Sequence, residues 1–119
     1  MTSYAGRFAG RTAIVTGGAS GLGCAVAKRI VEEGGRVALW DVDADRLAET
    51  QPEIGATHVE AFDVSDAAAV ARATDATVAA LGKVDILVCS AGITGATASV
   101  DQYPIDSWLR VVDINLNGL

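Results

Sequence analysis

The stretch Thr12–Gly23, TAIVTGGASGLG, decides the fold of this chain. Its first five residues, Thr12–Thr16, are rich in β-branched side chains and predict a short buried strand. Glycines follow at once and permit a tight turn, after which Gly21–Glu33 predicts a helix with one apolar stripe. That stripe is expected to consist of Leu22, Val26 and Ile30. A strand, a glycine turn and a helix in this order place free backbone N–H groups where a phosphate can bind them.

The same alternation of short apolar strands and helices continues along the chain. Further strands are predicted at Arg36–Trp40, His58–Phe62 and Asp85–Cys89. Apolar strands separated by helices predict a parallel sheet covered on both faces. Right-handed crossovers then give an α/β fold, half of a doubly wound Rossmann-type sheet, with strand order 3-2-1-4.

Capping residues mark where the helices begin and end. Gly34 is expected to cap the first helix, and Asp43 to start a short helix that ends near Thr50, before a loop containing Pro52 and Gly55. Ser65 is expected to start a longer helix that Gly82 closes. Pro104 is expected to open a last helix after the loop Ser90–Tyr103. The buried faces of the last two helices are expected to be Val70, Thr74, Val78 and Leu81, and Trp108, Leu109, Val112 and Leu116.

Composition excludes several classes of protein. The chain has 119 residues, of which 50% are hydrophobic and 20% charged, so one globular domain is expected and disorder is not. The net charge of −6 disfavours nucleic acid as a partner. No apolar stretch approaches the roughly 20 residues of a membrane helix, and Met1–Arg11 does not have the pattern of a secretory signal. With two cysteines, Cys24 and Cys89, the chain is expected to be cytoplasmic.

An acidic residue, Asp41, closes the second predicted strand, 18 residues after Gly23 (41 − 23). This is near the spacing of about 20 residues at which a carboxylate binds the adenosine ribose of a dinucleotide. A carboxylate there repels a 2′-phosphate, and Val42 offers no compensating positive charge, so NAD is favoured over NADP. Asp41 or Asp43 could alternatively cap the next helix, a role that Asp43 can fill alone.

Two other nucleotide sites do not fit the residues. An ATPase-type phosphate loop needs Gly-Lys-Ser/Thr, whereas Gly23 is followed by Cys24 and Ala25. A methyltransferase-like turn usually carries an acidic residue after the first strand, where this chain has Thr16. A plain strand-to-helix turn without a ligand remains the alternative.

Several motifs in the right order resemble the short-chain dehydrogenase/reductase family, from about Arg7 to Leu119. Thr16–Gly23 fits the family's TGxxxGxG turn, and Asp63-Val64 fits its adenine-binding pair. Ser90-Ala91-Gly92 resembles its Asn-Ala-Gly motif, and Asn115 matches its catalytic asparagine. The resemblance implies a set of cofactor-binding residues: Gly17, Ser20, Gly21, Leu22, Gly23, Asp41, Asp63, Val64, Ser90, Ala91 and Gly92. It also implies that Asn115 marks a helix distortion whose carbonyl holds a water of the proton relay.

For three of these residues a different interpretation stays open. Asp63 could equally cap a helix, and Asn115 in mid-helix suggests on sequence alone a solvent-facing position. Ser90 stands where the family usually has Asn, which puts the bracing role of that side chain in doubt. Cys24 and Cys89 are expected to be packing residues, no metal site is expected, and His58 is not expected to be catalytic.

The family's catalytic Tyr-x-x-x-Lys pair is absent from these residues. Tyr4 is followed four residues later by Phe8, and Tyr103 by Ser107. By the resemblance, residues 1–119 are expected to be the NAD-binding N-terminal half of a single-domain enzyme of roughly 250 residues. It would interconvert a secondary alcohol and a ketone, and would form a dimer or tetramer, so that Trp108 and its neighbours could be interface. The alternative is a regulatory dinucleotide-binding module without catalysis.

Overall fold

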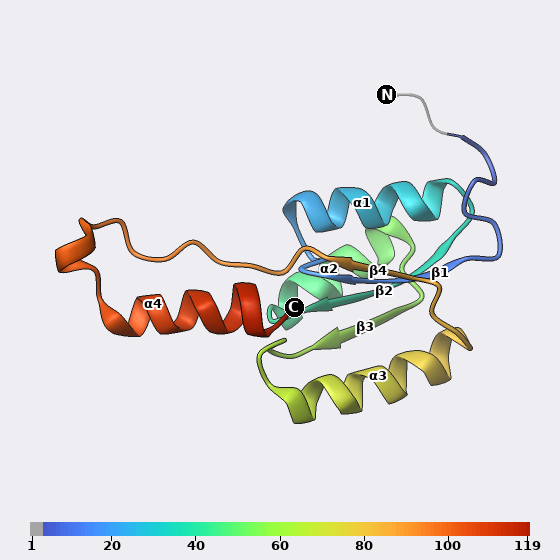
Figure 1. The fold of residues 1–119 in the computed structure, drawn as a ribbon. Coiled ribbons are helices and arrows are strands. Elements are labelled where there is room, and N and C mark those ends of the chain that lie inside the picture. Colours follow the sequence, from blue (N-terminus) through green and yellow to red (C-terminus); the bar gives the residue numbers. More distant parts are fainter. Residues whose placement is uncertain (1–3) are drawn as a thin grey trace.

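The structure, a computed structural model, describes residues 4–119 and has a parallel sheet at its centre (Figure 1). The elements are β1 (Thr12–Thr16), α1 (Gly21–Glu32), β2 (Arg36–Asp41), α2 (Ala44–Ile54), β3 (His58–Ala61), α3 (Ala67–Leu81), β4 (Ile86–Cys89), a 3-10 turn (Val100–Gln102), α4 (Ile105–Val112) and a π-helical turn (Asp113–Asn117). The first three residues of Met1–Arg11, where no secretory signal was expected, lie outside the described residues.

The sheet has the order β3-β2-β1-β4, as the sequence predicts. All three strand pairs are parallel, with Thr12 opposite Arg36 at one end of β1 and Thr16 opposite Trp40 and Cys89 at the other. The carboxyl ends of the four strands therefore meet at one edge of the sheet. In an open α/β sheet this is the edge where ligands bind.

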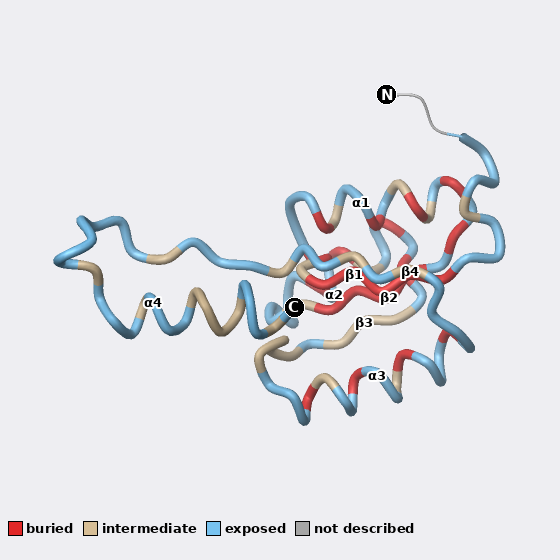
Figure 2. Tube along the Cα trace, in the orientation of Figure 1, coloured by how far each residue is buried: buried red, intermediate tan, exposed pale blue. Residues whose placement is uncertain are grey.

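The core lies on both faces of β1 and β2, the most deeply buried strands (Figure 2). On one face α1 and α2 cover Ala13, Val15 and Leu39; on the other, α3 covers Ile14, Ala38 and Trp40. The alternation of side chains along a strand explains this division, because successive residues point to opposite faces. Both faces of β1 and β2 are thus covered, as predicted, whereas β4 leaves Leu87 exposed on one face.

Several predicted caps are confirmed. The side chain of Asp43 accepts a hydrogen bond from the backbone N–H of Arg46, while Gly34 and Gly82 have positive φ angles at the ends of α1 and α3. Ser65 was wrongly expected to cap α3, because Asp66 accepts from the N–H of Ala69 instead. The prediction that α2 ends near Thr50, before a loop with Pro52 and Gly55, is wrong. α2 continues through Pro52 to Ile54 and is capped by Gly55, because the proline costs only one intrahelical hydrogen bond, to the exposed residue Ala48.

The buried faces of α1 and α3 are formed by smaller residues than predicted. α1 buries Gly23, Ala27 and Ile30, whereas Leu22 is 82% exposed and Val26 39%. α3 buries Ala69, Ala73, Thr77 and Leu81, so that Thr74 and Val78 were wrongly placed and Leu81 correctly. Small side chains let both helices lie close to the sheet, and close packing rather than bulk decides which face is buried.

The last helix departs most from expectation. α4 and the loop before it extend away from the sheet (Figure 1), and none of the residues predicted for its buried face is buried. Trp108, Leu109 and Leu116 are more than half exposed. Among residues 4–119, no helix is long and apolar enough to cross a membrane.

Candidate functional site

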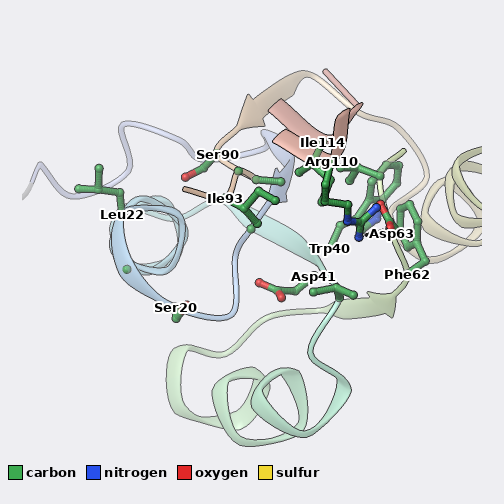
Figure 3. A pocket seen from close by; sticks show the side chains of 16 residues that line it. Ser20, Leu22, Trp40, Asp41, Phe62, Asp63, Ser90, Ile93, Arg110 and Ile114 are labelled. Carbon is green, nitrogen blue, oxygen red and sulfur yellow. Dashed lines mark hydrogen bonds and ion pairs between the residues drawn. The ribbon is translucent and has the colours of Figure 1, made fainter. Parts of the chain in front are cut away.

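A cleft of about 490 Å³ opens at the carboxyl edge of the sheet (Figure 3). All four strand ends contribute to it, and Arg110 of α4 and Ile114 of the π-helical turn close one side. Its lining residues are Gly17, Ser20, Gly21, Leu22, Trp40, Asp41, Val42, Phe62, Asp63, Val64, Ser90, Ala91, Gly92, Ile93, Arg110 and Ile114. The structure thus brings together every residue predicted to bind the cofactor except Gly23.

The glycine turn is built so that two backbone segments touch. Gly17 has a φ of +65°, and a β-carbon on it would lie 2.9 Å from the Cα of Ala91. A β-carbon on Gly23 would overlap the carbonyl oxygen of Gly17, so Gly23 packs α1 against the turn instead of lining the cleft. No side chain caps the start of α1 at Ser20 within the described chain. Its first N–H groups are therefore available to an anion in the cleft.

The carboxylate of Asp41 is fixed at the tip of β2. One oxygen accepts from the backbone N–H of Ala19 in the glycine turn at 3.1 Å, and the other from the N–H of Asp43, also at 3.1 Å. Because Asp43 caps α2, Asp41 is not a helix cap, and its carboxylate lines the cleft.

Asp63 lies beyond the end of β3 and binds three donors. Its Oδ1 accepts from the N–H and the hydroxyl of Ser65 at 2.9 and 2.7 Å, and Oδ2 pairs with Arg110 Nη2 at 2.7 Å. The Ser65 hydrogen bonds, followed by Arg110, lower the pKa of Asp63 to about 2. The carboxylate is therefore ionised at neutral pH. Asp66 caps α3, so the alternative of Asp63 as a helix cap does not hold.

Thr16 organises the strand end beside them, a role that the sequence analysis did not assign. Its hydroxyl oxygen accepts hydrogen bonds from the backbone N–H groups of both Ser90 and Ala91 at 3.1 Å. Within residues 4–119 the Ser90 hydroxyl makes no hydrogen bond, and Thr16 braces the turn in place of the Ser90 side chain. The available signal was the position of Thr16, at the last residue of β1.

Asn115 sits in the π-helical turn that follows α4, which is the distortion that the family resemblance implied. Its amide forms two hydrogen bonds with the backbone of Ile93, one to the carbonyl and one from the N–H, both 2.8 Å long. The residue is exposed, as its sequence context suggested, but its side chain is not free. It fastens the π-helical turn to the loop after β4.

Other lining residues carry no signal in the sequence. Trp40 and Phe62 form an edge-to-face pair with ring centroids 5.0 Å apart. Arg110 lies 47 positions after its partner Asp63 in the sequence. In the part of the chain that the structure describes, no group of three His, Cys, Asp or Glu could hold a metal ion. Cys24 and Cys89 are free thiols: Cys24 packs against the core as expected, whereas the prediction of Cys89 as a packing residue is wrong, because Cys89 is exposed on the edge strand β4.

The pattern of the short chain dehydrogenase family matches residues 11–119. The chain belongs to this family. It is 69% identical over 119 residues to 2-dehydro-3-deoxy-L-rhamnonate dehydrogenase (NAD(+)) of a Sphingomonas species, covering 100% of this chain and 48% of that protein. It is 39% identical over 116 residues to D-threitol dehydrogenase of Mycolicibacterium smegmatis, covering 94% and 44%.

Solved structures of the family share the fold. NAD+-bound xylitol dehydrogenase superposes with a TM-score of 0.90 at 36% identity, over 94% of this chain and 45% of that chain. A 3-ketoacyl-(acyl-carrier-protein) reductase of Brucella melitensis with NADH superposes with a TM-score of 0.89 at 34% identity, over 93% and 46%. The chain spans about half the length of the curated relatives it matches.

Proposed function

We propose that the protein is an NAD-dependent oxidoreductase that interconverts a secondary alcohol and a ketone, with residues 1–119 as its cofactor-binding half. One observation carries the proposal: the Asp41 carboxylate lies at the end of β2, bonded to the glycine turn, with Val42 rather than a cation beside it. Such a carboxylate accepts hydrogen bonds from both ribose hydroxyls of NAD and repels the extra phosphate of NADP.

The residues of the cleft fit a dinucleotide along its length. The turn from Gly17 to Gly23 would hold the pyrophosphate with its free N–H groups, and Asp63 with Val64 would bind the adenine. Next to Ser90, the small residues Ala91 and Gly92 would let the nicotinamide end pass close to β4. When bound, NAD supplies the group that accepts electrons from the alcohol.

For Asn115 we assign a supporting role in proton transfer. Its side chain holds the π-helical turn against Ile93, and by the family resemblance the carbonyl of this turn orders a relay water. The serine, tyrosine and lysine that exchange the proton in the family are expected beyond residue 119.

The substrate class that we propose is a sugar acid or a related polyol. The support is the 69% identity to an enzyme named for a deoxy sugar acid, together with relatives named for D-threitol and xylitol. A panel of aldonic acids, polyols and simple secondary alcohols with NAD tests this choice. Turnover of simple alcohols alone would contradict it.

The cofactor is tested by titrating the full-length protein with NAD and NADP, using thermal stabilisation as the readout. Asp41→Ala should weaken NAD binding by about tenfold or more, because charge-assisted hydrogen bonds are lost, and should weaken NADP much less. Asp45→Ala, an exposed residue on α2, is the matched control. Equal weakening of both nucleotides would contradict the role of Asp41, and no stabilisation of the wild type would contradict the function.

A second candidate function is a dinucleotide-binding module without catalysis. It predicts binding of NAD with no turnover of any alcohol in the panel by the full-length protein.

A further inference from the structure

Few contacts attach α4, the helix that precedes Asn115, to the sheet. α4 exposes Trp108 and Leu109, and it touches the loop after β4 through Ser107, whose hydroxyl accepts from the N–H of Ala96 at 2.9 Å. Among residues 4–119, the Arg110–Asp63 pair is the one ion pair between α4 and a strand end. The placement of α4 therefore depends on a small number of polar contacts.

The same pair sets what Asp63 can still accept. Each carboxylate oxygen has two lone pairs. Ser65 uses both on Oδ1, and Arg110 uses one on Oδ2. One acceptor position on Oδ2 is left, and the Asp63 and Arg110 side chains lie next to each other at the cleft (Figure 3).

Arg110 is also connected mechanically to the opposite end of the site. Arg110 and Ile114 are one helical turn apart and both line the cleft, and Asn115 follows directly. A shift of the Arg110 end of α4 therefore shifts the π-helical turn in which Asn115 lies.

We propose that Arg110 is a positioning residue that aims the free acceptor of Asp63 at the adenine and couples occupation of the adenine end to the placement of α4 and Asn115. This inference rests on the proposed function, because it takes the Asp63 end of the cleft as the adenine-binding end. Arg110 need not touch the reacting atoms. Its effect is carried by Asp63 on one side and by α4 on the other.

The test uses ADP-ribose, which carries the adenine end of NAD without the nicotinamide, on the full-length protein. Hydrogen–deuterium exchange should slow in residues 105–117 when ADP-ribose binds the wild type. In Arg110→Met this slowing should disappear, and the affinity for ADP-ribose should fall by roughly three- to tenfold, as expected for a half-exposed pair. The KM for NAD should rise by a similar factor.

Three further variants separate positioning from general stability. Arg110→Lys keeps the charge and should restore part of the coupling, and Arg72→Met, an exposed arginine on α3, should change neither affinity nor exchange. Asp63→Asn combined with Arg110→Met should cost less affinity than the two single variants together, because both act through one pair.

Two results would overturn the inference: wild type that binds ADP-ribose without slower exchange in residues 105–117, or Arg110→Met that retains both affinity and protection. Wild type that binds neither NAD nor ADP-ribose would overturn the proposed function, and this inference with it. Binding without the α4 response would overturn the inference alone.

Discussion

The hydroxyl of Thr16 shows how a single side chain can hold two strand ends together. Thr16 is 7% exposed, and its oxygen accepts the N–H groups of Ser90 and Ala91, which are 74 and 75 positions away in the sequence. These N–H groups begin the loop that runs along the cleft. Losing their acceptor would leave two backbone donors unpaired beside the proposed nicotinamide end.

Thr16→Val keeps the shape of the side chain and removes the acceptor. We expect it to lower the free energy of unfolding by about 1–3 kcal/mol, because two part-buried backbone donors lose their acceptor, and to weaken NAD binding. Thr16→Ser keeps the hydroxyl and should retain binding. Urea unfolding and NAD titration of both variants measure this; equal losses of binding in the two would show that the methyl group, and not the hydroxyl, matters.

At the scale of elements, the glycine turn between β1 and α1 is packed closely against neighbouring backbone. Gly17 donates its N–H to the carbonyl of Trp40 at 2.7 Å while its Cα faces Ala91. The turn is therefore held against β2 on one side and against the start of the β4 loop on the other. A side chain has no room in this arrangement.

Gly17→Ala should therefore destabilise the protein more than its backbone angle alone requires. Gly82→Ala is the matched control, because Gly82 has a φ of +83° and open space around it. We expect Gly82→Ala to cost about 1–2 kcal/mol for the left-handed conformation and Gly17→Ala to cost about 1–3 kcal/mol more for overlap with backbone. Thermal unfolding compares them, and equal melting temperatures would argue against the contact with Ala91.

The strands and the turn follow from local sequence, whereas the helix faces do not. β-branched residues before a glycine cluster mark β1, and Asp41 at the end of β2 and Asp63 just after β3 are placed at the cleft by these strands. By contrast, α3 packs Ala69 and Ala73 on the sheet and leaves Val78 partly exposed. A hydrophobicity pattern favours large residues, but a short distance between helix and sheet selects small ones.

Contacts between residues that are far apart in the sequence could not be predicted either. Glu33 is fully buried at the end of α1, where it accepts from the backbone of Tyr4 and from the side chains of Arg7 and Arg29. Burial raises the pKa of this carboxyl, but these hydrogen bonds together hold it below its usual value. A glutamate in a helical pattern predicts an exposed position, because nothing local indicates the arginine that will meet it.

At the scale of the whole molecule, the chain is more extended than a compact domain. Its radius of gyration is 15.5 Å, against roughly 13.5 Å for a compact chain of this length. The excess comes from α4 and the loop before it, which extend beyond the sheet (Figure 1). This extension leaves the apolar side of α4 in contact with solvent.

Two apolar regions of the 119-residue chain are thereby uncovered. On α4 and the π-helical turn after it these are Ile105, Trp108, Leu109 and Leu116, each more than half exposed. At the sheet edge, β4 pairs with β1 alone among the described strands, and Leu87 is 58% exposed. An open parallel sheet edge and an exposed apolar helix face both favour association between copies of the chain. The net charge of −6 opposes this association only at long range.

We therefore expect residues 1–119, expressed alone, to self-associate through α4 at micromolar concentrations. Replacing Trp108 and Leu109 with Gln should shift the sedimentation coefficient toward that of the monomer, whereas Val78→Gln on α3, a residue 41% exposed, should not. Fluorescence gives an independent readout, because Trp40 is 5% exposed and Trp108 is 59% exposed. Iodide should quench Trp108 in the dilute monomer and lose access to it as association proceeds.

If Trp108 stays equally accessible to iodide at every concentration, α4 is not the contact surface. Association would then have to arise at the β4 edge, where Leu87→Lys should suppress it.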